Sequence, residues 1–488
     1  MIEHSRRSHR APRDPARRTG LPPGASRIPL AWALLGAGVA LLAAGPAPGE
    51  EKAPAAPPTD LAALEKELKA SMTGGQIGRA KQIVDEFAAV GGKEACSIII
   101  KQALSGVDYD LERHAGGVLG KWGDPEGKAL ILESLQKASN FKTRIILLAV
   151  AARITDSPEA LAAIQRSVKD PIRQVVYAAL SWIREIGRTE PVDSLIDELE
   201  AREKKPRDRI YFDIRKTLGA LTGLELEAAA EWRSAWEARK KGGAPPAAEK
   251  KKSTTVVYKK PKPKFFAMDI ESDRVLFVID VSGSMLKKDP VIEEESPEVA
   301  DATKAKAKPT TGVAKKEPPP EPEEIDPESL PAHRQRIIRV KTELSNAVSS
   351  LPPNTRFGIL AFSHELEFWG GAKALKPATA ENKASAVSWV RGLRAEGATR
   401  TDLALEEALS LSEVDSIFLL TDGAPQLPGE GGDTRLPIEP ILADTKRDNR
   451  FLKCRIHTIS FRQIRDRDMR EFVQQLARQN DGVCKLLG

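Results

Sequence analysis

From residue 265 onward, short and continuously apolar segments alternate with longer segments of amphipathic helical pattern. Strands that are apolar throughout must be buried on both faces, and helices between them allow consecutive strands to run parallel. The pattern therefore predicts an α/β fold, a doubly wound and mostly parallel sheet with helices on both faces. The third strand follows the second too closely for a helical crossover, so it should pair antiparallel. The expected strands are residues 274–280, 356–363, 365–369, 416–422, 454–461 and 482–487.

Side chains that carry oxygen gather where two of these predicted strands end. Asp280 closes the first strand and is followed by Ser282 and Ser284, and Asp422 closes the fourth strand. In an open α/β sheet, ligands bind beyond the carboxyl ends of the strands. We therefore expect the loops that follow these two strands to form one site.

A turn between these two segments adds hydroxyl groups to the same edge. The stretch "EGATRTD" places Thr399 and Thr401 immediately before a predicted helix. Hydroxyl and carboxylate oxygens, without histidine or cysteine, suit Mg²⁺, Mn²⁺ or Ca²⁺ and do not suit zinc. The sequence predicts a divalent cation site built from three loops, in which either threonine is a candidate ligand.

The stretch "DVSGSM", which begins at Asp280, resembles the D-x-S-x-S signature of von Willebrand factor A domains. In that family, a threonine from a G-x-T loop and an aspartate from a T-D-G loop complete a metal-ion-dependent adhesion site. The stretches "GATRTD" and "LLTDGAP" supply both parts in the expected order. The resemblance covers about residues 265–488 and implies a sheet of strand order 3-2-1-4-5-6.

The resemblance also implies how each metal-site residue acts. The serines and the threonine hold the ion directly, the aspartates act mainly through water, and an acidic side chain of a partner protein fills the open position. Thr399 is preferred to Thr401 because it follows "GA", as in the short loop of the family. The implied metal-site residues are Asp280, Ser282, Ser284, Thr399 and Asp422.

A long polar segment, residues 287–331, separates the first strand from its helix, whereas the helix of the family follows the signature promptly. The segment is dense in Pro, Glu and Lys and has almost no large apolar residue. Such a composition cannot offset the entropy of ordering, so we expect it to be disordered. It could cover the metal site, present one of its glutamates to the ion, or loop aside.

Residues 51–241 carry the pattern of amphipathic helices separated by short polar turns. Three predicted helix starts contain a proline, at Pro125, Pro158 and Pro191, and these prolines recur at an interval of 33 residues. A helix pair that recurs at this period is typical of an α-solenoid, and the region resembles HEAT-type repeats, which serve as binding scaffolds. An ordinary helical bundle is the alternative. The Pro- and Lys-rich residues 242–264 are predicted to be a linker.

The first 50 residues are predicted to direct the chain out of the cytoplasm. A basic leader precedes residues 28–44, which are apolar and uncharged, and small residues follow. This order is typical of a cleaved export signal, and an uncleaved membrane anchor is the alternative. Either places the remaining chain in the periplasm, in the cell envelope or outside the cell.

The charge of the chain does not indicate nucleic-acid binding. Seven arginines against Glu3 and Asp14 give residues 1–27 a local charge of +5, so that only +1 of the net +6 belongs to the remaining chain. A basic footprint on a folded domain is therefore absent from the composition.

No enzymatic motif accompanies the oxygen cluster. The sequence lacks a phosphate-binding P-loop, a G-x-S-x-G elbow and an H-E-x-x-H zinc motif. His364 is expected in a loop and His457 in the core. We therefore expect a non-enzymatic, exported adhesion or assembly protein that binds an acidic partner through its cation, with the helical repeats as scaffold. The alternatives are an accessory subunit of an ATPase or chelatase complex, and a protein whose repeats bind while the sheet only supports them.

Overall fold

The computed structural model describes residues 60–154, 157–204, 207–242, 262–289, 331–429, 432–461 and 467–487. The basic leader, residues 28–44, most of the predicted linker and residues 290–330 of the polar segment lie outside these ranges. Within the described ranges, no helix combines the length and the apolar character needed to cross a membrane. Export, anchoring and the behaviour of residues 290–330 therefore stay predictions.

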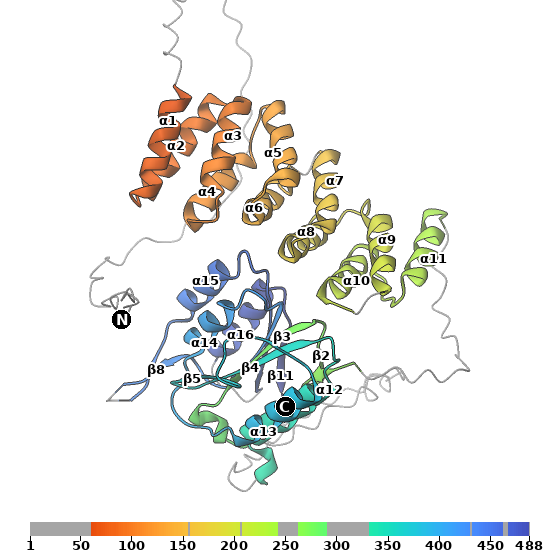
Figure 1. Ribbon diagram of the computed structural model, residues 1–488, viewed down its shortest axis with the longest axis vertical. Coiled ribbons are helices and arrows are strands. Elements are labelled where there is room, and N and C mark those ends of the chain that lie inside the picture. The colour runs from red at the N-terminus through yellow and green to blue at the C-terminus, as the bar shows by residue number, and fades with distance from the viewer. Residues whose placement is uncertain are drawn as a thin grey trace, which may run out of the picture. The chain divides into compact units, whose positions relative to one another are not determined.

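The N-terminal region is entirely helical over its described residues, and neighbouring helices run side by side in pairs (Figure 1). The expected all-α region is confirmed; its assignment to HEAT-type repeats stays a prediction. The helices are α1 (Leu61–Thr73), α2 (Ile77–Val90), α3 (Gly92–Ala103), α4 (Tyr109–Leu119), α5 (Pro125–Lys137), α6 (Phe141–Ala151), α7 (Pro158–Arg166), the 3-10 turn η1 (Ser167–Lys169), α8 (Arg173–Ile186), α9 (Val192–Glu203), α10 (Arg209–Thr222) and α11 (Ala229–Lys240).

The recurring prolines mark real helix starts. Asp124 and Ser157 are the N-caps of α5 and α7, and each side chain accepts a hydrogen bond from a backbone amide of the first turn. A proline in the next position costs nothing, because the amide it lacks would have no partner inside the helix. The third start differs, since Pro191 is itself the N-cap of α9 and provides no side-chain hydrogen bond.

The C-terminal region contains a mostly parallel sheet of order β11-β10-β7-β3-β4-β5, with β6 paired to β4. In terms of the six predicted strands, this is the predicted order 3-2-1-4-5-6. Only β5 and β6 pair antiparallel, both with β4. The strands are β3 (Arg274–Asp280), β4 (Arg356–Phe362), β5 (Leu366–Phe368), β6 (Lys376–Pro377), β7 (Ser416–Leu420), β10 (Arg455–Phe461) and β11 (Cys484–Leu487).

Helices cover both faces of this sheet, which confirms the doubly wound α/β fold (Figure 1). Helices α12 (Arg336–Ser350) and α13 (Ala380–Gly392) pack on one face, and α14 (Thr401–Leu409), α15 (Ile438–Asp448) and α16 (Arg467–Gln479) pack on the other. Alternate residues of β3, such as Phe277 and Val278, enter the two separate cores. Burial on both faces explains why the strand is apolar throughout. Two short hairpins were not predicted: β1 (Lys264–Phe265) with β2 (Met268–Asp269), and β8 (Gln426–Leu427) with β9 (Thr434–Arg435).

Helices α8 and α10 contact the edge of the sheet at which its strands begin. Arg173 lies 2.7 Å from Asp273 and 2.7 Å from Asp415, the residues that directly precede β3 and β7. Asp213 of α10 forms an ion pair with Arg455, the first residue of β10. The helical region is therefore joined to the sheet by direct contacts as well as by the linker. These contacts leave the carboxyl ends of the strands to the loops described below.

The two ends of the long polar segment are hydrogen-bonded to each other. Lys288 and Gln335 form an antiparallel bridge, and the amide of Arg336 donates to the carbonyl oxygen of Lys287 at 2.9 Å. We call residues 287–289 and 334–336 the neck. Residues 287–289 were expected to be disordered, but these contacts order them between the 3-10 turns η2 (Gly283–Leu286) and η5 (Ala332–Arg334).

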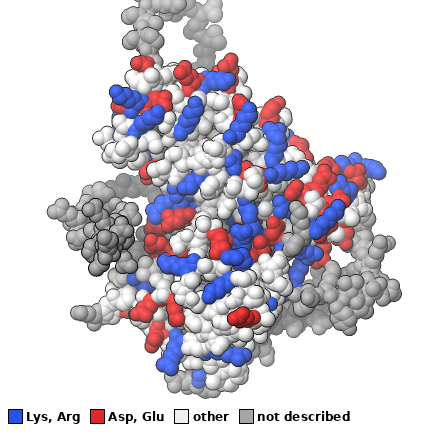
Figure 2. Space-filling view, viewed as in Figure 1, with Lys and Arg blue, Asp and Glu red and all other residues white. Residues whose placement is uncertain are grey.

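Charged side chains of both signs are interspersed over the face shown in Figure 2.

Candidate functional site

The loops that carry the predicted metal-site residues meet at the carboxyl ends of β3 and β7. The hydroxyl oxygens of Ser282 and Ser284 lie 3.0 Å apart, and the Ser284 hydroxyl donates a hydrogen bond to Oδ1 of Asp422. A Cβ atom added to Gly423 would lie 2.9 Å from the hydroxyl of Thr399 and 3.4 Å from that of Ser284. The structure therefore brings the hydroxyls of two loops and the carboxylate of a third around one small space.

Backbone hydrogen bonds hold these loops together. The amide of Gly283 donates to the carbonyl oxygen of Gly397 at 3.0 Å, and the amide of Gln426 donates to that of Thr399 at 2.8 Å. Gly397 has φ +79°, and an added Cβ atom would lie 1.9 Å from Nδ1 of His364. Both the backbone conformation and the space therefore require glycine ahead of Thr399.

Asp280 is fully buried and anchors the first loop. Its Oδ1 accepts a hydrogen bond from the amide of Ser282 at 2.8 Å, and its Oδ2 accepts one from the hydroxyl of Thr421 at 2.7 Å. Burial and the negative charge of Asp422 raise the pKa of Asp280 to about 7, against the lowering effect of these hydrogen bonds. A cation between the loops would relieve this repulsion. The hydroxyl of Thr421 was not predicted as part of the site.

Arg336, the first residue of α12, also reaches the site. Its Nη1 donates to Oδ2 of Asp422 at 2.6 Å, and its Nε and Nη2 donate to the carboxylate of Asp289 at 2.9 and 2.7 Å. The three side chains of Arg336, Asp289 and Asp422 are 7%, 3% and 0% exposed. Sequence reasoning missed both residues, because Asp289 lies near the start of the polar segment, Arg336 lies beyond its end, and neither belongs to a motif.

The two threonines of the "GATRTD" turn differ in their surroundings. The Thr399 hydroxyl lies beside Gly423, close to the two serines. The Thr401 hydroxyl is buried without a hydrogen-bond partner among the described residues. A buried hydroxyl left unpaired costs about 1–3 kcal/mol. The geometry therefore agrees with Thr399 as the member of the cluster and leaves Thr401 with an unused donor.

This set of side chains fits a hard divalent cation. No group of three or more His, Cys, Asp and Glu side chains that could hold a metal ion occurs in the described part of the chain. The cluster offers hydroxyl oxygens with two carboxylates instead, a donor set that suits Mg²⁺ when water completes the shell. The space bounded by Gly423, Thr399 and Ser284 is consistent with that fit.

His364 and His457 lie outside this cluster of oxygens. His457 is buried in β10, where its ring stacks on Phe418 and its Nδ1 accepts a hydrogen bond from the amide of Val483 at 3.3 Å. It is the core histidine that the sequence predicted. His364 is exposed in the loop after β4, also as predicted.

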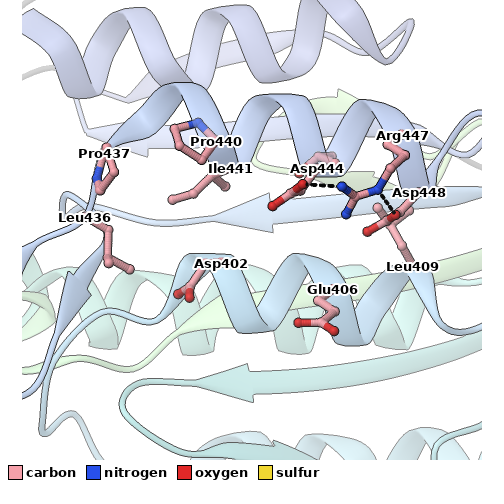
Figure 3. Close-up of a pocket in the computed structure, with 11 residues that line it drawn as sticks. Asp402, Glu406, Leu409, Leu436, Pro437, Pro440, Ile441, Asp444, Arg447 and Asp448 are labelled. Atoms are coloured by element: carbon pink, nitrogen blue, oxygen red, sulfur yellow. Dashed lines mark hydrogen bonds and ion pairs between the residues drawn. The ribbon is translucent and has the colours of Figure 1, made fainter. Parts of the chain in front are cut away.

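A separate pocket of about 370 Å³ lies between α14 and α15 (Figure 3). Most of its acidic side chains already have partners, since Arg447 pairs with Asp444 and Asp448, and Asp402 pairs with Arg400. None of the five predicted metal-site residues lines it. The pocket is therefore distinct from the cluster of oxygens.

Residues 331–486 match the von Willebrand factor type A domain family. The matched range begins after the polar segment, so the D-x-S-x-S stretch lies ahead of it, although β3 is central in the same sheet. The C-terminal region is a von Willebrand factor type A domain with a mostly parallel central sheet, and such a domain supports a role in protein interaction or adhesion.

Two human relatives are similar to this chain over part of its length. Von Willebrand factor A domain-containing protein 3A is 31% identical over 121 residues, which cover 25% of this chain and 9% of that protein. Protein 3B is 28% identical over 145 residues, which cover 30% of this chain and 10% of that protein. The similarity thus spans about a tenth of these relatives.

Two solved structures are similar to the chain at low sequence identity. A von Willebrand factor type A protein from Catenulispora acidiphila gives a TM-score of 0.30 at 14% identity, over 44% of this chain and 38% of that one. Proximal thread matrix protein 1 from the mussel byssus gives 0.25 at 14% identity, over 43% and 40%.

Proposed function

Starting from the von Willebrand factor type A domain of residues 331–486, we propose that this protein is a non-enzymatic binding protein that captures a partner protein through a divalent cation. The observation that carries the proposal is the convergence of Ser282, Ser284, Thr399 and Asp422 at the carboxyl edge of the sheet. The cation is Mg²⁺, or Mn²⁺ or Ca²⁺ in its place, because all of the donors are oxygens.

The residues have distinct roles in this proposal. The hydroxyls of Ser282, Ser284 and Thr399 hold the ion, and Asp280 and Asp422 act mainly through water. Asp280 also orients the first loop by accepting the amide of Ser282. The bound cation supplies a positive centre, and an acidic side chain of the partner fills its open coordination position. Binding of this kind depends on the metal and on the partner's carboxylate together.

The helical region serves as a scaffold for the von Willebrand factor A domain. Its helix pairs start at a 33-residue spacing, which is typical of an α-solenoid. The ion pairs of Arg173 and Asp213 with the starting edge of the sheet support a role in presenting the opposite, metal-binding edge to a partner. We further propose that the basic leader and residues 28–44 export the protein, so that the partner is an envelope or extracellular protein. Cell fractionation tests this: recovery of the full-length chain in the cytoplasm contradicts export.

Calorimetry tests the metal site. Titration of Mg²⁺ and Mn²⁺ into the protein should give saturable binding, and the double variant Ser282→Ala/Ser284→Ala should abolish it. Ser349→Ala is the matched control, because the hydroxyl of this exposed serine donates to the carbonyl oxygen of Ser345 in the same helix, α12. Absence of binding to the wild-type protein would contradict the proposal.

A pull-down from envelope extract, with and without EDTA, tests the carboxylate partner. Capture should require the metal and should be lost in the serine double variant. A partner that is retained in EDTA and by the double variant would instead assign binding to the helical region.

A further inference from the structure

We propose that Arg336 is an internal cation that sets the metal affinity of the site, and that Asp289 in the neck counterbalances it. This inference rests on the proposed metal site. It concerns two residues that belong to no part of the D-x-S-x-S, G-x-T or T-D-G pattern.

The geometry joins the neck to the site through one guanidinium group. Arg336 donates two hydrogen bonds from Nε and Nη2 to Asp289, and its Nη1 donates to Asp422 at 2.6 Å. The other oxygen of Asp422 accepts from Ser284. Both oxygens of Asp422 therefore have donors, and one donor carries a full positive charge.

Burial strengthens the electrostatic interactions among these three side chains. The side chains of Arg336, Asp289 and Asp422 are almost fully enclosed, and the guanidinium also lies 4.9 Å from the centre of the Phe461 ring. Charges that are withdrawn from water interact far more strongly than charges on the surface. A divalent cation at the cluster would therefore be repelled by Arg336 and attracted by Asp289.

Two variants of this ion pair should shift the metal affinity in opposite directions. Arg336→Gln removes a positive charge beside Asp422, so the affinity for Mg²⁺ should rise by about tenfold or more. Asp289→Asn removes a negative charge on the far side of the guanidinium, so the affinity should fall. A merely structural role predicts something else: both variants break buried hydrogen bonds, and both would then weaken the site.

Two further variants serve as controls. Arg336→Lys keeps the positive charge but loses the forked geometry of the guanidinium group. Its affinity for Mg²⁺ should therefore differ from that of the wild type less than the affinity of Arg336→Gln does. Arg339→Gln removes the same charge one turn along α12, from a residue that lies 3.5 Å from Asp289. Because Arg339 lies farther from Asp422 along the helix than Arg336 does, Arg339→Gln should change the affinity for Mg²⁺ less than Arg336→Gln does.

The experiment is calorimetric titration of Mg²⁺ and Mn²⁺ at constant ionic strength, together with thermal unfolding in EDTA and in saturating Mg²⁺. Arg336→Gln should bind more tightly and should unfold at a lower temperature in EDTA, with a larger rise on adding Mg²⁺ than the wild type shows. Unchanged or weaker binding by a folded Arg336→Gln, while Ser282→Ala/Ser284→Ala abolishes binding, would overturn this inference and leave the proposed function standing. Absence of binding to every protein, Arg336→Gln included, would overturn the proposed function itself.

Discussion

Asp213 in α10 and Arg455 at the start of β10 form an ion pair in which both side chains are almost fully buried, 2% and 4% exposed. Asp213 also accepts a hydrogen bond from Arg209, 3.2 Å away. Buried charges of this kind need oppositely charged partners, because they no longer have the water molecules that solvate them in the unfolded chain.

Asp213→Ala should lower the free energy of unfolding by about 3–5 kcal/mol, since it leaves the charge of Arg455 buried without this partner. Urea unfolding followed by circular dichroism measures the change. Glu133→Ala is the control, because Glu133 forms an exposed pair with Lys137 and should have no measurable effect. Equal stability of the two variants would show that the contact between helices and sheet contributes little.

Gly397→Ala should weaken both the fold and the metal site. A left-handed backbone costs a residue with a Cβ atom about 1–2 kcal/mol, and this Cβ atom would also clash with His364. The control is Gly371→Ala, where φ is +71° and nothing lies within 4 Å of the added atom, so that only the backbone term remains. Urea unfolding and Mg²⁺ titration of Gly397→Ala/His364→Ala should show partial recovery; no recovery would place the whole cost in the backbone.

Asp280→Asn should separate stability from metal binding. Asn keeps an oxygen that can accept the amide of Ser282 and removes one of two buried negative charges, so the thermal unfolding temperature in EDTA should not fall. The metal affinity should drop about 10- to 100-fold, as it does when a group that orients the ligands is lost. A large drop of the unfolding temperature in EDTA would show that the charge of Asp280 is needed by the fold.

His457 should make the protein less stable in acid. Burial, followed by the nearby charges of Arg455, Arg209 and Lys216, lowers the pKa of His457 to about 3, although Asp481 acts to raise it. The unfolded chain binds a proton near pH 6.5 that the folded chain does not bind until about pH 3. The stability from neutral His457 is thus present above pH 6.5 and is lost as the pH falls, by about 2 kcal/mol at pH 5.

Urea unfolding of His457→Phe at pH 7 and pH 5 measures this contribution. Between pH 7 and pH 5 the variant should lose about 2 kcal/mol less stability than the wild type does, because the protonation of His457 in the unfolded chain is removed. Phe418→Leu, which removes the stacked ring but no titrating group, should lower stability equally at both. An unchanged pH dependence in His457→Phe would assign the acid sensitivity to other groups.

Strand order and the cluster of oxygens were predictable because each leaves a local pattern in the sequence. Continuous apolar runs indicated strands buried on both faces, and Asp280 and Asp422 ended two of them. The pairing of Asp289 with Arg336 and then with Asp422 leaves no such pattern, because it depends on the neck bringing distant residues together. The contact of Arg173 with Asp273 and Asp415 was likewise not predictable from local sequence patterns, because it joins a helix of the N-terminal region to the loops that precede two strands of the sheet.

The neck has a consequence for how this domain can vary. The bridge between Lys288 and Gln335 holds together two points of the chain that are far apart in the sequence. Each doubling of a loop's length adds only about 0.6 kcal/mol to the entropy of closing it. If residues 290–330 are disordered, as their composition predicts, the sequence between these two points can lengthen, shorten or be exchanged at little thermodynamic cost, as long as the neck residues still meet.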